Sequence, residues 1–274
     1  MMKSLPALTA LAAVSLFAGC YQVPVTGRHA LSLVDDREVT KMSIATFDEM
    51  KAHTKISNDK ARNEQLQRVG ERIQHAVPIW DMPDADWEFV VFDSPDINAF
   101  AMAGGKVGVF MGLFKIVEND DQLASVIGHE IGHVTAKHVH ENLSQQLAMQ
   151  TGGMIGGIAM LGTGAGLLGT EAVMSAYGLG AQGMGAAFDR KKEKEADHIG
   201  LMYMAHAGYD PEEAIKVLEK LEEETGQQAA SQSSFTSTHP SNPERIQQLR
   251  DLMPQAIKAR EQSGLAPPPP VIMK

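Results

Sequence analysis

The pentapeptide HEIGH at residues 129–133 constrains the fold of this chain more than any other feature. It lies within an apolar run whose spacing predicts a helix over residues 120–147. Residues four apart on a helix share a face, so His129 and His133 point the same way and Glu130 leans over the same region. The opposite side of this helix is apolar, and the rest of the chain must cover it.

Two histidines and a glutamate at this spacing suit a catalytic zinc site. Zinc binds imidazole nitrogen readily, and a catalytic site holds the ion with three protein ligands and keeps one position for water. A glutamate beside that position can act as general base on the water. A chain with ten histidines can contain HExxH by chance, so the alternative that both are solvated helix residues stays open here.

A third metal ligand is expected further along the chain, where the run EKEAD offers three acids on a helix predicted over residues 189–206. Glu193 and Asp197 lie four apart and share a face. Glu193 can therefore bind zinc while Asp197 accepts the outer N–H of a ligating histidine. Glu195 is expected to point away from the metal.

Gly132 leaves room for another element to approach the HEIGH helix closely.

The other periodicities predict an α+β fold, mainly helical, with a small sheet of three to four strands beside the HEIGH helix. Residues 87–92 and 106–111 are rich in aromatic and β-branched types and predict strands. A short strand at 98–101 and a tight turn at Gly104-Gly105 complete the expected sheet. Capping residues and apolar stripes predict the remaining helices, which begin after Asp35 or Asp36, after Asn58 (residues 59–77), after Asp210-Pro211 and at Pro243.

Composition and charge limit the function classes. A chain of 274 residues with 43% hydrophobic and 21% charged residues is typical of one folded domain with short appendages. The formal net charge of −10 argues against nucleic acid as a partner. Cys20 is the only cysteine, which excludes an internal disulfide and a zinc site built from thiolates.

Residues 1–19 resemble the signal peptide of a bacterial lipoprotein. Lys3 precedes an apolar run that ends in two small residues before Cys20. Cys20 is then the expected lipid attachment site, and residues 20–34 are a lipid anchor and tether that holds the protein at a membrane. Tyr21 in place of aspartate after the cysteine favours the outer membrane over the inner one. The alternative is an ordinary cleaved signal with a chance cysteine.

Residues 35–253 form the expected catalytic domain, and within it residues 152–187 are glycine-rich and apolar. A membrane span must be weighed for this segment, but its few large apolar residues favour a mobile lid or a membrane-facing hairpin beside the site. Residues 254–274 are expected to be a proline-rich disordered tail. The basic run at 190–192 is expected to be a solvated helix end.

HEIGH followed by EKEAD, with NAFAMAGG before and THP after, resembles the HtpX and CAAX-prenyl-endopeptidase family of zinc metallopeptidases, which are gluzincins with a zincin-like fold. The leader and the PVTGR segment are similar to the outer-membrane lipoprotein branch typified by LoiP and BepA. The tetratricopeptide repeats of the BepA type do not follow. The resemblance implies one Zn²⁺ per chain, held by His129, His133 and Glu193, with Glu130 as base and Asp197 behind a ligand.

The resemblance also singles out His239 of the THP turn, as a donor to the oxyanion or as a resting metal ligand. Packing beside Pro240 is its alternative role. Arg245 either assists nearby or is a surface helix residue. In the family, the strand matching residues 106–111 lies near the active-site helix, so it either presents an exposed edge to an extended substrate or lies inside the sheet.

The function that the resemblance implies is a zinc endopeptidase that cleaves unfolded or misassembled envelope proteins in the periplasm. The expected partners are such substrates, the membrane through the lipid anchor, and the machinery that assembles outer-membrane proteins. One alternative is a lipid-anchored, zinc-stabilised chaperone or assembly factor with little proteolysis. Another is a polytopic membrane enzyme in which the glycine-rich segment spans the bilayer.

Overall fold

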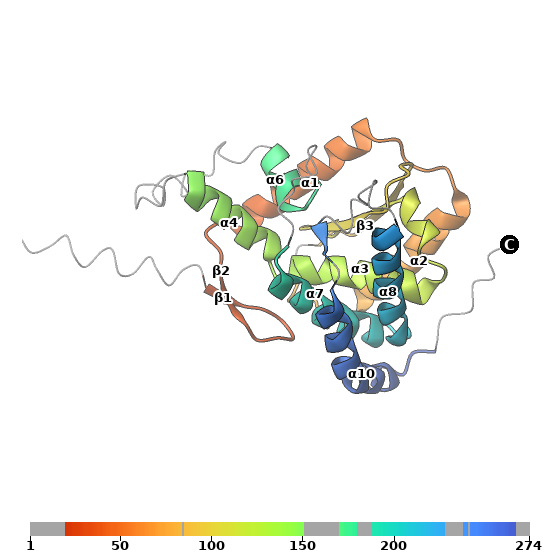
Figure 1. Ribbon diagram of the computed structural model, residues 1–274. Helices are drawn as coiled ribbons and strands as arrows, with labels where there is room; N and C mark the ends of the chain where they lie inside the picture. Colours follow the sequence, from red (N-terminus) through yellow and green to blue (C-terminus); the bar gives the residue numbers. More distant parts are fainter. Residues whose placement is uncertain are drawn as a thin grey trace, which may run out of the picture.

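The computed structural model of the chain describes residues 20–83, 85–150, 170–179, 188–227, 238–240 and 242–266 (Figure 1). A two-stranded hairpin is formed by β1 (Cys20–Gln22) and β2 (His29–Leu31). A three-stranded sheet is formed by β3 (Glu88–Phe92), β4 (Ala99–Met102) and β5 (Lys106–Phe110). The helices are α1 (Asp36–His53), α2 (Lys60–Ala76), η2 (Met111–Lys115), α3 (Asp120–Thr135), α4 (His138–Gln150), α6 (Thr170–Ala176), α7 (Arg190–His206), α8 (Glu212–Gln227) and α10 (Pro243–Ser263). The expected fold class, α+β and mainly helical with a small sheet, is confirmed.

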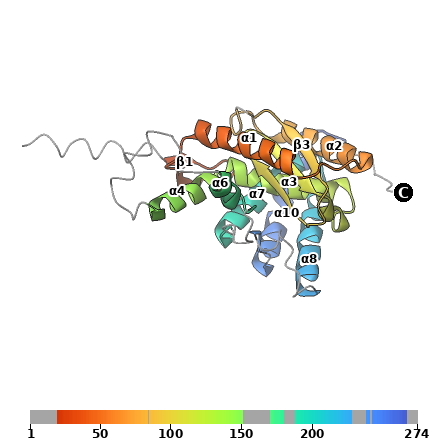
Figure 2. The same ribbon diagram turned by 90° about the horizontal axis from the view of Figure 1, so that it is seen from above.

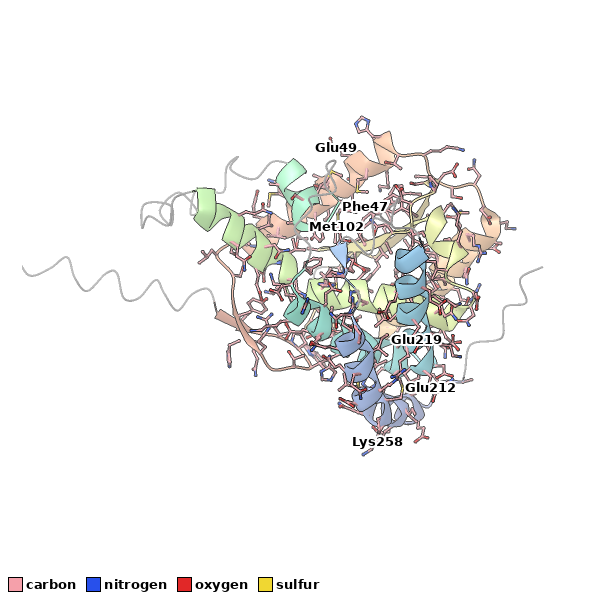
Figure 3. The ribbon with its side chains drawn as sticks, in the orientation of Figure 1. Phe47, Glu49, Met102, Glu212, Glu219 and Lys258 are labelled. Carbon is pink, nitrogen blue, oxygen red and sulfur yellow. The ribbon has the colours of Figure 1, made fainter. Side chains whose placement is uncertain are left out.

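Helix α3 lies at the centre of the molecule and contacts β4, α2, α7 and α8. In Figure 1 the sheet and α1 lie above α3, while α7 and α10 lie below it, and Figure 2 shows α1 and α2 along one side and α8 on the other. Interior side chains such as Phe47 and Met102 are fully buried, whereas Glu49 and Lys258 point into solvent (Figure 3). The HEIGH helix is therefore covered by the sheet on one face and by helices on the other.

The sheet has the order β3-β5-β4, with β3 parallel and β4 antiparallel to β5. Gly104 and Gly105 form the predicted turn between β4 and β5, and both have positive φ, at 86° and 78°. Because β5 is the central strand and pairs on both sides, it offers no free edge. The hypothesis that residues 106–111 bind substrate as an exposed edge is wrong, and the interior alternative is confirmed.

The helix predicted over residues 120–147 is two helices, because the chain turns after Thr135. Lys137 has φ 55° and its amine pairs with Asp36 at 2.5 Å. The hydroxyl of Tyr21 donates to the carbonyl of Ala136 at 2.5 Å, so partners from the N-terminal region complete the end of α3. The apolar pattern of the sequence continues across this break, so the periodicity does not reveal it.

The cap of α2 also differs slightly from the prediction, because the N-cap residue is Asp59 rather than Asn58.

The segment expected to be a tether begins as a hairpin that packs on the domain. β1 and β2 pair antiparallel from Cys20 opposite Leu31 to Gln22 opposite His29. Val23 in the connecting loop is 1% exposed, which ties the loop to the core. The burial of Val23 and the ion pairs of Arg28 with Glu141 and Glu195 explain why this stretch is ordered.

Helix α10 continues past residue 253, where the expected catalytic domain ends, through Pro254 to Ser263. Proline removes one backbone hydrogen bond from a helix. Burial of Ala256 and Ala259 beyond it offsets that loss, and Gly264, with φ 64°, ends the helix. Residues 267–274 of the expected tail lie outside the described residues.

Most of the glycine-rich segment, residues 152–187, lies outside the described residues, and only 170–179 are described. The described part contains α6, whose Val173 and Ala176 are buried. The prediction of a lid or membrane-facing hairpin at residues 152–187 stays a prediction. No helix among the described ranges is both long enough and apolar enough to cross a bilayer.

Candidate metal centre

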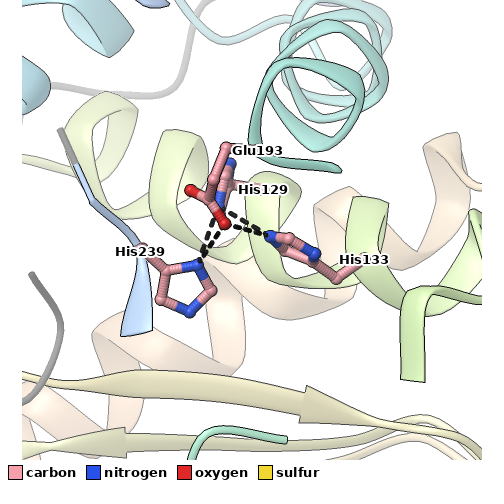
Figure 4. A group of neighbouring side chains, drawn as sticks. All are labelled: His129, His133, Glu193 and His239. Carbon is pink, nitrogen blue, oxygen red and sulfur yellow. Dashed lines mark hydrogen bonds and ion pairs between the residues drawn. The ribbon is translucent and has the colours of Figure 1, made fainter. Parts of the chain in front are cut away.

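Four side chains from three segments meet in the interior of the molecule (Figure 4). They are His129 and His133 of α3, Glu193 of α7 and His239 of the THP turn, and one ligand atom from each lies within 4.8 Å of the others. All four are buried. Glu193 therefore lies close to the two histidines, as expected, although about sixty positions separate them in the sequence.

The separations within this group fit a zinc ion. Donors about 2.0–2.1 Å from a tetrahedral zinc lie about 3.3–3.4 Å from one another. The Nε2 atoms of His129 and His133 are 3.1 Å apart, and Nδ1 of His239 is 3.3 Å from Nε2 of His129. Glu193 Oε1 lies 3.2 Å from His133 Nε2 and 3.0 Å from His239 Nδ1. Three imidazoles and one carboxylate are also the donor types that zinc prefers.

Close contact between α3 and α7 brings the two halves of this group together. Gly132 and Gly128 of α3 face Ala196 and Gly200 of α7, and a Cβ at Gly132 would lie 2.8 Å from the carbonyl oxygen of Ala196. A Cβ at Gly200 would lie 2.6 Å from backbone atoms of α3. The close approach predicted at Gly132 is confirmed. The glycines at 128 and 200 share that role and were not anticipated.

Glu193 lies in the first turn of α7, whose N-cap is Asp189. Its side chain has no exposed surface, and Nη1 of Arg245 lies 2.7 Å from its Oε2. Burial alone would raise the pKa of this carboxyl, but Arg245 and the neighbouring histidines outweigh burial and hold the pKa well below its ordinary range. Glu193 is therefore an anion that faces the imidazoles.

Asp197 occupies the position expected behind a histidine, with Oδ1 2.9 Å from Nδ1 of His129. Arg245 binds both oxygens of the same carboxylate at 2.7 Å. Arg245 is only 1% exposed, so its interpretation as a surface helix residue is wrong. Its guanidinium neutralises two buried acids, Glu193 and Asp197, and fixes both relative to α10.

Glu130 is 4% exposed and lies on the same side of α3 as the two histidines. Its Oε1 lies 3.6 Å from Nε2 of His239 and makes no hydrogen bond within the described part of the chain. Burial raises the pKa of this carboxyl above its ordinary value. A buried carboxyl with an oxygen available beside a metal site can exchange protons with a bound reactant.

His239 lies within reach of the metal position rather than packing only beside Pro240. Phe188 links the segment of His239 to α3. The amide of Phe188 donates to the carbonyl of Thr238 at 3.1 Å, and its ring stacks on His133 at a centroid distance of 4.0 Å. The ring of His239 thus lies among the other candidate metal donors.

Three residues near the site have partners that the sequence did not predict. Glu195 points away from the metal group, as expected, and its Oε2 lies 3.0 Å from Nε2 of the buried His138. His138 in turn contacts the outer nitrogen of His133. Lys192 is 6% exposed and its amine donates to Asn142, so the expectation of a solvated basic helix end is wrong for this residue. The run of histidines in HEIGHVTAKHVH is the one sequence signal that pointed to His138.

A helix with two histidines and a glutamate, completed by a glutamate from a second helix, defines the class of zinc-dependent peptide hydrolases. The chain belongs to Peptidase family M48, whose sequence profile matches residues 60–253. The chain therefore has the family and the donor set of a zinc metallopeptidase, the class that the sequence predicted, and zinc is the metal that this site fits.

Three relatives illustrate the similarity. The mitochondrial metalloendopeptidase OMA1 of Schizosaccharomyces pombe is 33% identical over 195 residues, which are 71% of this chain and 55% of the relative. The OMA1 of Saccharomyces cerevisiae is 36% identical over 182 residues, 65% of this chain and 50% of the relative. The β-barrel assembly-enhancing protease of Escherichia coli K12 is 27% identical over 251 residues, 89% of this chain and 50% of the relative. The chain thus spans about half the length of these relatives.

Proposed function

We propose that this protein is a zinc metalloendopeptidase that cleaves unfolded or misassembled proteins of the bacterial envelope, with His129, His133 and Glu193 as zinc ligands and Glu130 as general base. One observation carries the assignment of roles: the donor atoms of the three proposed ligands lie 3.1–3.5 Å from one another, while Oε1 of Glu130 is buried beside them and has no hydrogen-bond partner in the described part of the chain. A purely structural zinc site has no use for such a carboxylate.

The residues divide the reaction among them. Zinc at this site supplies Lewis acidity, which polarises the scissile carbonyl and makes an attacking water more acidic. Glu130 accepts the proton of that water and delivers it to the leaving amine nitrogen as the peptide bond breaks. Arg245 and Asp197 keep Glu193 and His129 in place, so the base and the ligands stay aligned during proton transfer.

His239 is proposed to be the fourth donor to the metal in the resting protein. Its Nδ1 lies 3.0 Å from Oε1 of Glu193, and its Nε2 faces Glu130. Once a substrate is bound and His239 no longer acts as a donor to the metal, its imidazole could donate a hydrogen bond to the developing oxyanion. Both roles given to His239 by its sequence motif then belong to successive states of one residue.

The proposed substrates and location rest on the leader and on the relatives. Residues 1–20 carry the lipoprotein pattern, so Cys20 is the proposed lipid attachment site and the periplasmic face of the outer membrane the proposed location. The similarity to the E. coli β-barrel assembly-enhancing protease extends over 89% of this chain, more than the 71% for the S. pombe protein. Envelope proteins that fail to assemble are the substrate class that this combination supports.

The experiment compares the purified protein with Glu130→Gln, which preserves the shape of the side chain and removes its basicity. We expect the variant to bind zinc as the wild type does and to cleave unfolded casein about 10²–10⁴-fold more slowly, the loss typical of a missing general base. Exposed Glu49→Gln on α1 is the matched control and should cleave normally. Undiminished cleavage by the Glu130 variant would refute its role as base.

A zinc-stabilised chaperone with little proteolysis is the alternative function. It predicts that Glu130→Gln still prevents aggregation of unfolded outer-membrane proteins and that the wild type scarcely cleaves them. Chelator-sensitive cleavage of casein by the wild type supports the peptidase instead. Radiolabelled lipid incorporated into the wild type and not into Cys20→Ala would support the proposed anchor.

A further inference from the structure

A line of buried contacts leads from the metal centre to the N-terminal hairpin. Nδ1 of His133, the ring nitrogen that faces away from the metal group, lies 2.8 Å from Nδ1 of His138. Nε2 of His138 lies 3.0 Å from Oε2 of Glu195. His133, His138 and Glu195 are 2%, 0% and 8% exposed, so bulk water does not separate these contacts. The proposed mechanism uses neither His138 nor Glu195.

The chemistry of the rings fixes the direction of every proton in this line. A carboxylate only accepts, so the proton between His138 and Glu195 must lie on Nε2 of His138. A neutral His138 then has a lone pair on Nδ1, which can accept but cannot donate. The proton between the two rings must therefore lie on Nδ1 of His133. That leaves Nε2 of His133 as a lone pair directed at the metal position.

The two proposed histidine ligands are thus oriented differently. His129 contacts a carboxylate directly, through its Nδ1 and Asp197 at 2.9 Å. The outer nitrogen of His133, Nδ1, contacts the imidazole of His138 instead, and that imidazole contacts the carboxylate of Glu195. Zinc-binding histidines depend on such outer partners for their tautomer and their ring orientation.

The carboxylate of Glu195, at the end of this series of contacts, is held by side chains of the hairpin. The hydroxyl of Thr26 donates to Oε1 of Glu195 at 2.5 Å, and Nε of Arg28 donates to Oε2 at 2.7 Å. Arg28 also binds Glu141 of α4 at 2.7 Å. Figure 1 shows the hairpin beside α4 and α7, the helices that carry His138 and Glu195. Thr26 and Arg28 precede the residues 60–253 that match the family profile.

We propose that Glu195 and His138 are positioning residues that set the tautomer of His133, and that the hairpin completes the metal centre because Thr26 and Arg28 hold Glu195. The proposal rests on the proposed role of His133 Nε2 as a zinc ligand. It makes the stretch that directly follows Cys20 a working part of the site rather than a passive connection to the membrane.

The first test replaces His138 by two residues of opposite capacity in the full-length protein. The amide of Gln can accept from His133 and donate to Glu195, whereas Leu can do neither. Zinc affinity, measured by competition with a chromophoric chelator, should fall about 10–100-fold in His138→Leu and stay within about threefold of wild type in His138→Gln. Equal affinity in the two variants would overturn the proposal.

The second test addresses the hairpin and does not depend on whether His138→Leu folds. In the zinc-loaded protein, long-range ¹H–¹⁵N correlation of the histidine rings should report a proton on Nδ1 of His133 and on Nε2 of His138. Thr26→Val combined with Arg28→Met should give His138 mixed tautomers and weaken zinc binding about tenfold. Arg37→Met, at a side chain 90% exposed, is the matched control and should change neither readout.

Glu193→Gln in the same competition assay separates the two proposals. Loss of zinc affinity in Glu193→Gln, with unchanged tautomers and affinity in the hairpin variant, would overturn the positioning role alone. Unchanged affinity in Glu193→Gln would overturn the ligand assignment on which that role rests.

Discussion

Substituting Gly200 by alanine should damage the metal centre although this residue touches no proposed ligand side chain. A Cβ at Gly200 would lie 2.6 Å from the carbonyl carbon of Gly128 and from the amide nitrogen of His129. Ordinary contacts begin near 3.4 Å, so α7 must move away from α3 by about 0.8 Å. Both obstructing atoms belong to the backbone of α3 and cannot rotate aside.

Two energies decide the size of the effect. Overpacking of this kind costs about 1–3 kcal/mol. The better helix propensity of alanine returns about 1 kcal/mol, which leaves a net loss of about 0–2 kcal/mol. The shift matters more for zinc, since ligand distances in metal sites hold within about 0.2 Å and Glu193 moves with α7. We therefore expect zinc affinity to fall at least about tenfold.

Urea denaturation of the metal-free protein measures the first effect, and chelator competition measures the second. Lys258→Ala, at an exposed position of α10, serves as control and should change stability by less than about 0.5 kcal/mol. If Gly200→Ala kept wild-type stability and zinc affinity, the contact between α3 and α7 would not be what places Glu193 at the histidines.

Three further predictions concern charge and metal. Arg245→Met should destabilise the protein by about 3–5 kcal/mol in urea denaturation, because it leaves the buried acids Glu193 and Asp197 without their cation; a loss below about 1 kcal/mol would contradict this. The ring of His140, whose Nε2 lies 3.3 Å from Oδ1 of Asp36, and the ion pair with Lys137 hold the pKa of Asp36 below its ordinary value. Asp36 therefore stabilises the fold at neutral pH, and the difference from Asp36→Asn should shrink as pH falls below about 3.9; a difference independent of pH would refute this. Removal of zinc by a chelator should lower the melting temperature, and added zinc should restore it, because zinc binds only the folded site; an unchanged melting temperature would show that the ion contributes nothing to folding.

The parts of the site that sequence could predict follow from the local geometry of helices. The spacing of His129 and His133 places them on one face whatever the rest of the fold does. The same rule placed Glu193 and Asp197 together on α7. Tertiary structure then decided only which helices meet, and the glycine at 132 indicated that α3 had a close neighbour.

The missed parts depend on contacts between segments far apart in the sequence. Arg245 became a buried partner of Glu193 and Asp197 only because α10 packs against α7. The partners of Glu195 were missed because two of them, Thr26 and Arg28, belong to the N-terminal hairpin, which had been taken for a tether. The break after Thr135 escaped notice for a similar reason, since Tyr21 supplies the partner that ends α3 there. No local pattern encodes any of these pairings.

The position of the metal can be measured by anomalous diffraction at the zinc edge, from crystals of the metal-loaded protein. We expect one strong peak about 2.0–2.2 Å from Nε2 of His129, Nε2 of His133 and a carboxylate oxygen of Glu193. A peak elsewhere, or one at the two histidines with Glu193 outside bonding distance, would contradict this expectation.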